Sequence, residues 1–153
     1  MFRKLLIGAA VVAALTASGL AFAQKAEFGT AAEAKAMLEK AVAAVKADKA
    51  KALDMFNKGE GGFKDRDLYP FCANAGDGVI NAGSAATVGK KVQDLKDKSG
   101  KAFGEEMMKV AVEGKITEVS YMFPRPGAEA TPVEKVSFVT KVGDQLCGVG
   151  YYK

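Results

Sequence analysis

The pattern of apolar and polar residues changes once along the chain, at about residue 60. Between Thr30 and Asn57, apolar side chains recur mostly at steps of three and four residues, with lysines and acids between them. This spacing places the apolar side chains on one face of a helix. Thr30 and Glu33 form a capping box that starts the helix, and the glycine-rich residues 59–62 end it. We therefore predict a long helix over about residues 30–57, whose apolar face carries Met37, Leu38, Ala41, Val42, Val45, Leu53 and Phe56.

After residue 63 the pattern becomes that of β-strands. Short runs of apolar, β-branched and aromatic residues are separated by glycine and aspartate turns, which predicts hairpins. The second and third strands are separated by a polar connection, residues 83–100, and a short helix within residues 101–114. One side of that helix carries Phe103, Met107, Val110 and Ala111. The predicted strands cover about residues 67–74, 79–82, 116–123, 133–142 and 145–152.

The first 23 residues have the composition of a secretory signal peptide. Two basic residues, Arg3 and Lys4, precede an uncharged apolar run, and Ala21 and Ala23 supply the small residues that signal peptidase reads. The apolar run is also nearly long enough for a membrane anchor, which is the alternative interpretation. We expect cleavage after Ala23. Residues 24–153 then form a single periplasmic domain.

Composition excludes several classes of chemistry. The chain has 22 basic and 18 acidic residues, a formal charge of +4, and loss of Arg3 and Lys4 lowers it to +2. No basic block is present, so we expect no nucleic-acid partner. The chain contains no histidine, which removes imidazole bases and imidazole metal ligands. Asp94 and Asp97 lack the ligand spacing of a calcium loop. We therefore expect no enzyme, no metal site and no cofactor.

The two cysteines fall in the first and the last predicted strand, at Cys72 and Cys147. In an oxidising compartment an even count favours a disulfide, and the alternative is two buried free thiols that pack as small apolar residues. A bridge across this separation would stabilise the fold by about 4 kcal/mol in the chain-entropy model. Since bridged Cα atoms lie only about 5.5 Å apart, a disulfide requires the first and last strands to be neighbours.

Four short motifs occur in a recognisable order over residues 63–153. They are Gly-Lys at 89–90, Asp-Leu-Lys-Asp at 94–97, Tyr-x-x-Pro-x-Pro-Gly at 121–127 and Gly-x-Gly-Tyr at 148–151. With them the chain resembles the second type of single Cache domain, a family of PAS-like extracytoplasmic sensors. The resemblance implies an α+β fold in which a long N-terminal helix packs on a five-stranded antiparallel sheet of order 2-1-5-4-3. It also implies a pocket between the sheet and the helical insertion, which in related domains holds small organic anions, amino acids or similar metabolites.

Six residues are candidates for binding such a ligand. The aromatic candidates come in pairs that share one side of a strand, where they either line a pocket or pack a core. A lysine in the middle of a strand is unusual, and it either neutralises a ligand carboxylate or points to solvent. The arginine lies between two prolines, and it either offers a rigid fork to a carboxylate or is a solvated loop residue. The candidates are Tyr69, Phe71, Tyr121, Phe123, Arg125 and Lys135.

The chain ends directly after the last predicted strand. We therefore expect a stand-alone periplasmic module that binds a small organic acid or amino acid and passes its occupancy to a partner. That partner would be a membrane receptor or another periplasmic protein. The alternative is a structural or interaction module with a filled core and no ligand. A cavity lined by Tyr121, Arg125 and Lys135 would favour the first interpretation, and an exposed apolar patch the second.

Overall fold

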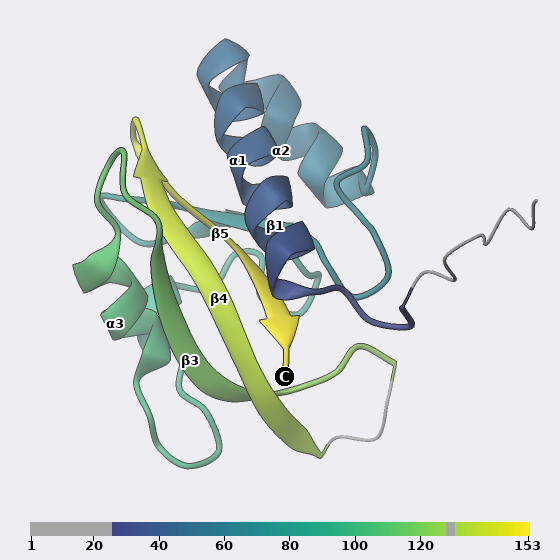
Figure 1. The fold of residues 1–153 in the computed structure, drawn as a ribbon. Coiled ribbons are helices and arrows are strands. Elements are labelled where there is room, and N and C mark those ends of the chain that lie inside the picture. The colour runs from purple at the N-terminus through teal and green to yellow at the C-terminus, as the bar shows by residue number, and fades with distance from the viewer. Residues whose placement is uncertain (1–25, 128–130) are drawn as a thin grey trace, which may run out of the picture.

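The structure, a computed structural model, describes residues 26–127 and 131–153 (Figure 1). The predicted signal peptide over residues 1–23 lies outside the described residues. The described residues form an α+β fold built on a five-stranded antiparallel sheet of order β2-β1-β5-β4-β3, as predicted. The elements are α1 (Ala31–Ala47), α2 (Lys49–Lys58), β1 (Pro70–Asn74), β2 (Ile80–Ala82), the 3-10 helix η1 (Val92–Asp94), α3 (Phe103–Val110), β3 (Thr117–Pro124), β4 (Pro132–Val142) and β5 (Gln145–Tyr152). Within this part of the chain, no helix has the length and apolarity needed to cross a membrane.

The prediction of one long helix over residues 30–57 is wrong at a single residue. Asp48 adopts an extended conformation, with φ −159° and ψ 99°, and it ends α1 and begins α2. Its side chain accepts a hydrogen bond from the backbone N–H of Lys51, as an N-cap does. The predicted capping box at Thr30 and Glu33 is present, and Gly59 closes α2 in the left-handed conformation. The apolar period continues across Asp48, so periodicity alone did not show the break.

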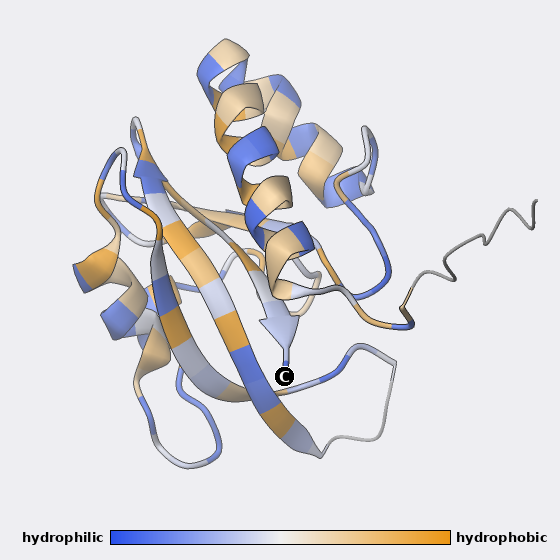
Figure 2. Ribbon diagram, viewed as in Figure 1, coloured by the Kyte–Doolittle hydropathy of each residue, from blue (hydrophilic) through white to orange (hydrophobic). Residues whose placement is uncertain are grey.

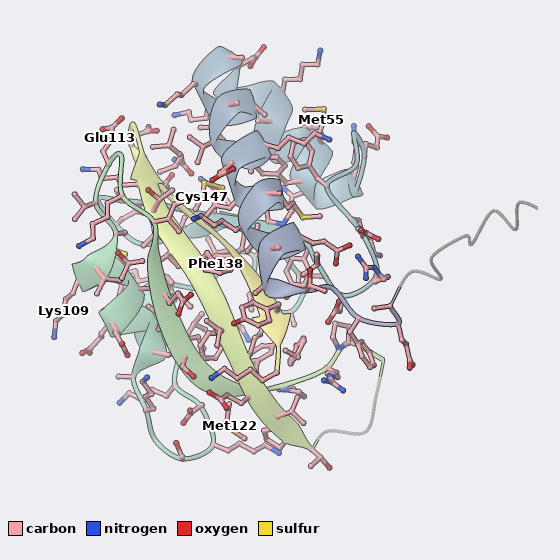
Figure 3. All side chains as sticks on the ribbon, in the orientation of Figure 1. Met55, Lys109, Glu113, Met122, Phe138 and Cys147 are labelled. Atoms are coloured by element: carbon pink, nitrogen blue, oxygen red, sulfur yellow. A yellow bond between two sulfur atoms is a disulfide. The ribbon has the colours of Figure 1, made fainter. Side chains whose placement is uncertain are left out.

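The two faces of the sheet carry different layers. In Figure 1 the helices α1 and α2 cover one face, and α3 lies on the opposite side of the sheet. Side chains of each strand alternate between the two layers, and Figure 2 shows the resulting alternation of hydropathy along β4. The layer under α1 and α2, which we call the helix-covered layer, contains Phe138 and Cys147, labelled in Figure 3. We call the opposite side, under η1 and α3, the pocket face.

A disulfide joins β1 to β5 in the helix-covered layer. Cys72 and Cys147 are directly opposite one another in the register of these strands, and their sulfur atoms are bonded at 2.07 Å. Both cysteines are completely buried. The predicted bridge and the predicted neighbourhood of the first and last strands are therefore present in the structure.

The connection after β2 is less polar in the structure than its composition suggested. It contains η1, in which Val92 is only 1% exposed. Val92 packs with Phe103 and Met107 of α3 in the apolar cluster of the pocket face. Gly104 lies so close to the backbone oxygen of Val92 that any side chain there would overlap it. The connection and α3 thus form one tightly packed roof over the pocket face.

Candidate ligand-binding site

An inner pocket lies between the pocket face of the sheet and its roof. Its volume is about 40 Å³. Five of the six residues predicted from the sequence line it: Tyr69, Phe71, Tyr121, Phe123 and Lys135. The remaining wall comes from Ile80 of β2, from the connection after β2 with η1, and from α3. The pocket therefore lies between the sheet and the helical insertion, as the resemblance implied.

Lys135 is the one charged side chain in the lining of this pocket. It is only 4% exposed, which excludes the solvent-facing orientation that the sequence left open. Its Nζ lies 4.8 Å from the ring centre of Tyr152, 5.1 Å from that of Tyr69 and 5.2 Å from that of Phe123. Among the described residues no carboxylate lies within ion-pair distance of Nζ. Burial lowers the pKa of Lys135 to about 8, and the charge of Asp67 partly opposes this change.

Two glycines of β5 make room for the lysine and for a neighbouring ring. Gly150 is opposite Ser137 in the sheet register, and a Cβ there would lie 2.6 Å from Ser137 Oγ and would overlap Cε of Lys135. A Cβ at Gly148 would overlap the ring of Phe71. Both positions therefore require glycine because side chains from neighbouring strands lie across them.

The hydroxyl groups of two tyrosines are fixed near the lysine. Tyr121 Oη and Ser137 Oγ form a hydrogen bond of 2.8 Å, and the Tyr121 ring stacks on Phe103 with 4.0 Å between ring centres. Tyr152 donates a hydrogen bond of 2.8 Å to the carbonyl of Pro124. Burial raises the pKa of both tyrosines, so both stay neutral in the physiological range.

Asp67 belongs to this site, although sequence reasoning did not select it. The residue is 6% exposed, and its Oδ1 accepts a hydrogen bond of 2.7 Å from the backbone N–H of Gly29. Its Oδ2 is buried and has no partner among the described residues. The charge of Asp67 acts on both Lys135 and Tyr152. Its position directly before the apolar run Leu68–Phe71 was the one feature of the sequence that could have indicated a buried acid.

Arg125 does not line the inner pocket. It lines an outer cleft of about 540 Å³, together with the end of α2, residues 83–86 and residues 123–126. Tyr69 and Phe123 line both spaces and so form the wall between them. The single cavity lined by Tyr121, Arg125 and Lys135 is therefore two adjoining spaces in the structure, with the lysine in one and the arginine in the other.

Comparison with known proteins gives the family. The single Cache domain 2 family matches residues 21–149. The chain belongs to this family. The match begins well before residue 63, where the sequence motifs that carry the resemblance start, and it includes both helices of the helix-covered layer. No curated protein matches the chain.

Solved structures similar to this Cache domain include parts of chemotaxis proteins and a chemosensory domain. A methyl-accepting chemotaxis protein from Vibrio parahaemolyticus RIMD 2210633 aligns with a TM-score of 0.61 at 20% identity, over 79% of this chain and 86% of that chain. A Cache chemosensory domain described for its carboxylic acid recognition has a TM-score of 0.56 at 22% identity, over 77% and 84%. The periplasmic sensor domain of a chemotaxis protein has a TM-score of 0.55 at 19% identity, over 77% and 86%. At these identities the likeness shows the fold.

Asp97, the second acid of the Asp94–Asp97 motif, has a structural role in this Cache domain. Oδ1 of Asp97 accepts hydrogen bonds from Ser99 and from the backbone of Lys101, and its Oδ2 accepts one from the backbone N–H of Met122. These bonds lower the pKa of Asp97 to about 2 and attach the connection to β3. In the described part of the chain, no cluster of three or more acids, cysteines or histidines could hold a metal ion.

The inner site has the chemistry of a receptor for a small anion. It combines an apolar wall, one buried ammonium group and fixed tyrosine hydroxyls, which is the usual composition of a small-molecule pocket. The lysine is held away from solvent, so its charge is available mainly to a group inside the pocket. Burial removes water from the charged group of Lys135. A carboxylate placed in the pocket would give this group an ionic partner instead.

Proposed function

We propose that this Cache domain is a periplasmic module that binds a small organic acid or an amino acid in the inner pocket. Lys135 neutralises the carboxylate, Tyr121 orients it, and Tyr69, Phe71 and Phe123 enclose its apolar part. The single observation that carries the proposal is the burial of Lys135 against the pocket, without an ion-pair partner among the carboxylates that the structure describes. A relative of the same fold described for carboxylic acid recognition supports the ligand class.

The energetics of the lysine support this role. A lysine that is 4% exposed has lost nearly all of its hydration, and the face of an aromatic ring replaces only part of it. At neutral pH a group with a pKa of about 8 is still mainly charged. An anion entering the pocket would therefore gain a desolvated charge-assisted hydrogen bond, which is stronger than the same contact at the surface.

The size of the pocket sets the size of the ligand. A volume of about 40 Å³ accommodates roughly three water molecules, at about 10–15 Å³ for each. The ligand that fits without movement of the roof is thus a short acid of a few non-hydrogen atoms, such as acetate or propionate. Larger acids and amino acids require the roof of η1 and α3 to shift.

Occupancy would pass to a partner protein, either a membrane receptor or another periplasmic protein. The sensory roles named for the similar chemotaxis domains support this part of the proposal. Inside the domain, Asp67 connects the site to the start of α1, because it acts on Lys135 and accepts a hydrogen bond from Gly29. A change in the charge balance at Lys135 therefore reaches the segment that precedes α1.

Calorimetric titration of residues 24–153 with acetate, propionate, pyruvate and glycine tests the proposal. We expect one of these probes to bind, and Lys135→Met to weaken its binding at least about tenfold, since a hydrogen bond to a charged group contributes about 1.5–3 kcal/mol. Lys141→Met is the matched control, because Lys141 is exposed on the same strand. Equal affinity of the Lys135→Met variant and the wild type would remove the lysine from the site.

A second candidate function is a structural or interaction module without a ligand. The observation that favours it is the inner pocket's volume of about 40 Å³, well below the 300 Å³ or so at which small-molecule pockets usually begin. Absence of binding across the panel, together with no rise in melting temperature at millimolar acid, would support this candidate. A ligand at a hundred times its dissociation constant adds about 2.7 kcal/mol of stability, so binding would be visible.

A further inference from the structure

We propose that the outer cleft is a second anion site, which takes a carboxylate with a planar apolar body too large for the inner pocket. Arg125 would bind the carboxylate, with Lys64 as a supporting charge. This site does not depend on ligand binding at Lys135. The argument rests on the charges of the cleft, the fixed position of the arginine and the apolar wall beside it.

Among the residues that the structure describes, the cleft is lined by four basic side chains and no acidic one: Lys58, Lys64, Arg66 and Arg125. Two of the four are already neutralised, because Lys58 and Arg66 each form an ion pair of 2.7 Å with a carboxylate of α2 and α1, respectively. In the described part of the chain, Lys64 and Arg125 have no carboxylate partner. The cleft therefore has two cations whose charges are not balanced locally, and it favours an anionic ligand.

Arg125 is held in place by aromatic rings, and none of the described acids forms an ion pair with it. The centre of its guanidinium group lies 4.1 Å from the ring centre of Phe28 and 5.4 Å from that of Tyr152. Within the described part of the chain its one hydrogen bond is long, 3.4 Å from Nη2 to the carbonyl of Lys153, and its Nε is buried without a partner. A guanidinium group fixed in this way keeps most of its donors available for a carboxylate.

The wall beside the arginine is apolar and partly aromatic. It includes Tyr69, Phe123, Pro124 and Pro126, which present flat surfaces suited to a ring. The cleft volume of about 540 Å³ is within the range of small-molecule sites. Since the inner pocket has about 40 Å³, a two-ring acid fits only outside the wall of Tyr69 and Phe123.

The test is a titration of residues 24–153 with 2-naphthoate, followed by calorimetry and by amide chemical shifts. We expect Arg125→Gln to weaken binding at least about tenfold, as expected for loss of a charge-assisted hydrogen bond. Lys64→Gln should weaken it about two- to fivefold, because this lysine is exposed. Lys109→Gln is the control, because it removes the same charge from an exposed position on the far side of α3 (Figure 3). Affinity should be unchanged in the control.

Three results would overturn the proposal. They are absence of 2-naphthoate binding at millimolar concentration, equal weakening by Arg125→Gln and Lys109→Gln, and loss of binding in the Lys135→Met variant. The last result would mean that the acid reaches the inner pocket after a rearrangement. Acetate and propionate separate this proposal from the function proposed above, because their binding should depend on Lys135 and not on Arg125. Each site can thus fail while the other is retained.

Discussion

Replacement of Lys135 by methionine should make the unliganded domain more stable at neutral pH. The folded state holds the pKa of Lys135 at about 8, against an ordinary value of 10.5. This difference corresponds to about 3 kcal/mol of unfavourable free energy for the charged lysine below pH 8. This amount is net of the contacts that Nζ makes with three aromatic rings. Methionine fills a similar volume without a charge, so we expect a net gain of up to about 3 kcal/mol.

The pH dependence gives the sign of the effect independently. Because the folded pKa is below the unfolded one, the unfolded chain binds more protons between pH 8 and pH 10.5. The stability of the wild type must therefore rise with pH in this window, as the penalty on the charged lysine disappears. The advantage of the Lys135→Met variant should shrink by roughly 2 kcal/mol between pH 7 and pH 9.5. The raised pKa values of Tyr121 and Tyr152 act above pH 10 and in both proteins, so they cancel in the difference.

Urea unfolding followed by circular dichroism measures this difference, with the disulfide intact and at several values between pH 7 and pH 9.5. Lys141→Met, on the same strand and exposed, should show neither the gain nor its pH dependence. A Lys135→Met variant that is at least 1 kcal/mol less stable than the wild type, at every pH, would refute the reasoning. The aromatic rings and Asp67 would then be sufficient partners, and the lysine would be a structural cation.

Three further variants test other parts of the structure. Gly150→Ala should abolish small-acid binding in a titration, because the added methyl group overlaps the side chain of Lys135; unchanged affinity would show that the lysine has room to move. Replacement of Cys72 and Cys147 by alanine should lower the free energy of unfolding by about 4 kcal/mol, and a loss below 1 kcal/mol in urea would contradict that estimate. Asp97→Asn should remove an acid-sensitive contribution to stability: the pKa of Asp97 is lowered to about 2 from 3.8, so this contribution is complete above pH 4 and is lost as the pH falls toward 2. Urea midpoints at pH 6 and pH 3 should therefore differ less in this variant than in the wild type.

The order of the strands was predictable because two independent arguments agreed. Strands that carry bridged cysteines must be neighbours, and the Cache motifs imply the same order. Helix and strand positions followed from the apolar period. The break at Asp48 was not predicted, because the apolar residues on either side stay on one face while the backbone of a single residue becomes extended. The one indication of this break in the sequence was Asp48 itself, because aspartate is a favoured N-cap residue.

The separation of Lys135 from Arg125 could not be predicted from strand alternation. Alternation predicts the face of the sheet on which the side chain of a strand residue lies, and Arg125 lies just beyond the end of β3. The rings of Tyr69 and Phe123 separate Lys135 from Arg125 only because the chain before β1 lies near the end of β3. Such a contact between segments distant in sequence cannot be read from the strand pattern. Asp67 was missed for a related reason, since its partners Gly29 and Lys135 are distant in sequence.

The wall formed by Tyr69 and Phe123 has a thermodynamic consequence. Both rings line the inner pocket and the outer cleft, so the wall has a cavity on each side. An occupant of either space that shifts these rings changes the shape of the other space, so two ligands bound together would share a coupling free energy. By linkage, each would alter the affinity for the other by the same factor. If both proposed sites bind acids, two adjoining cavities with one common wall would let this small domain respond to a combination of them.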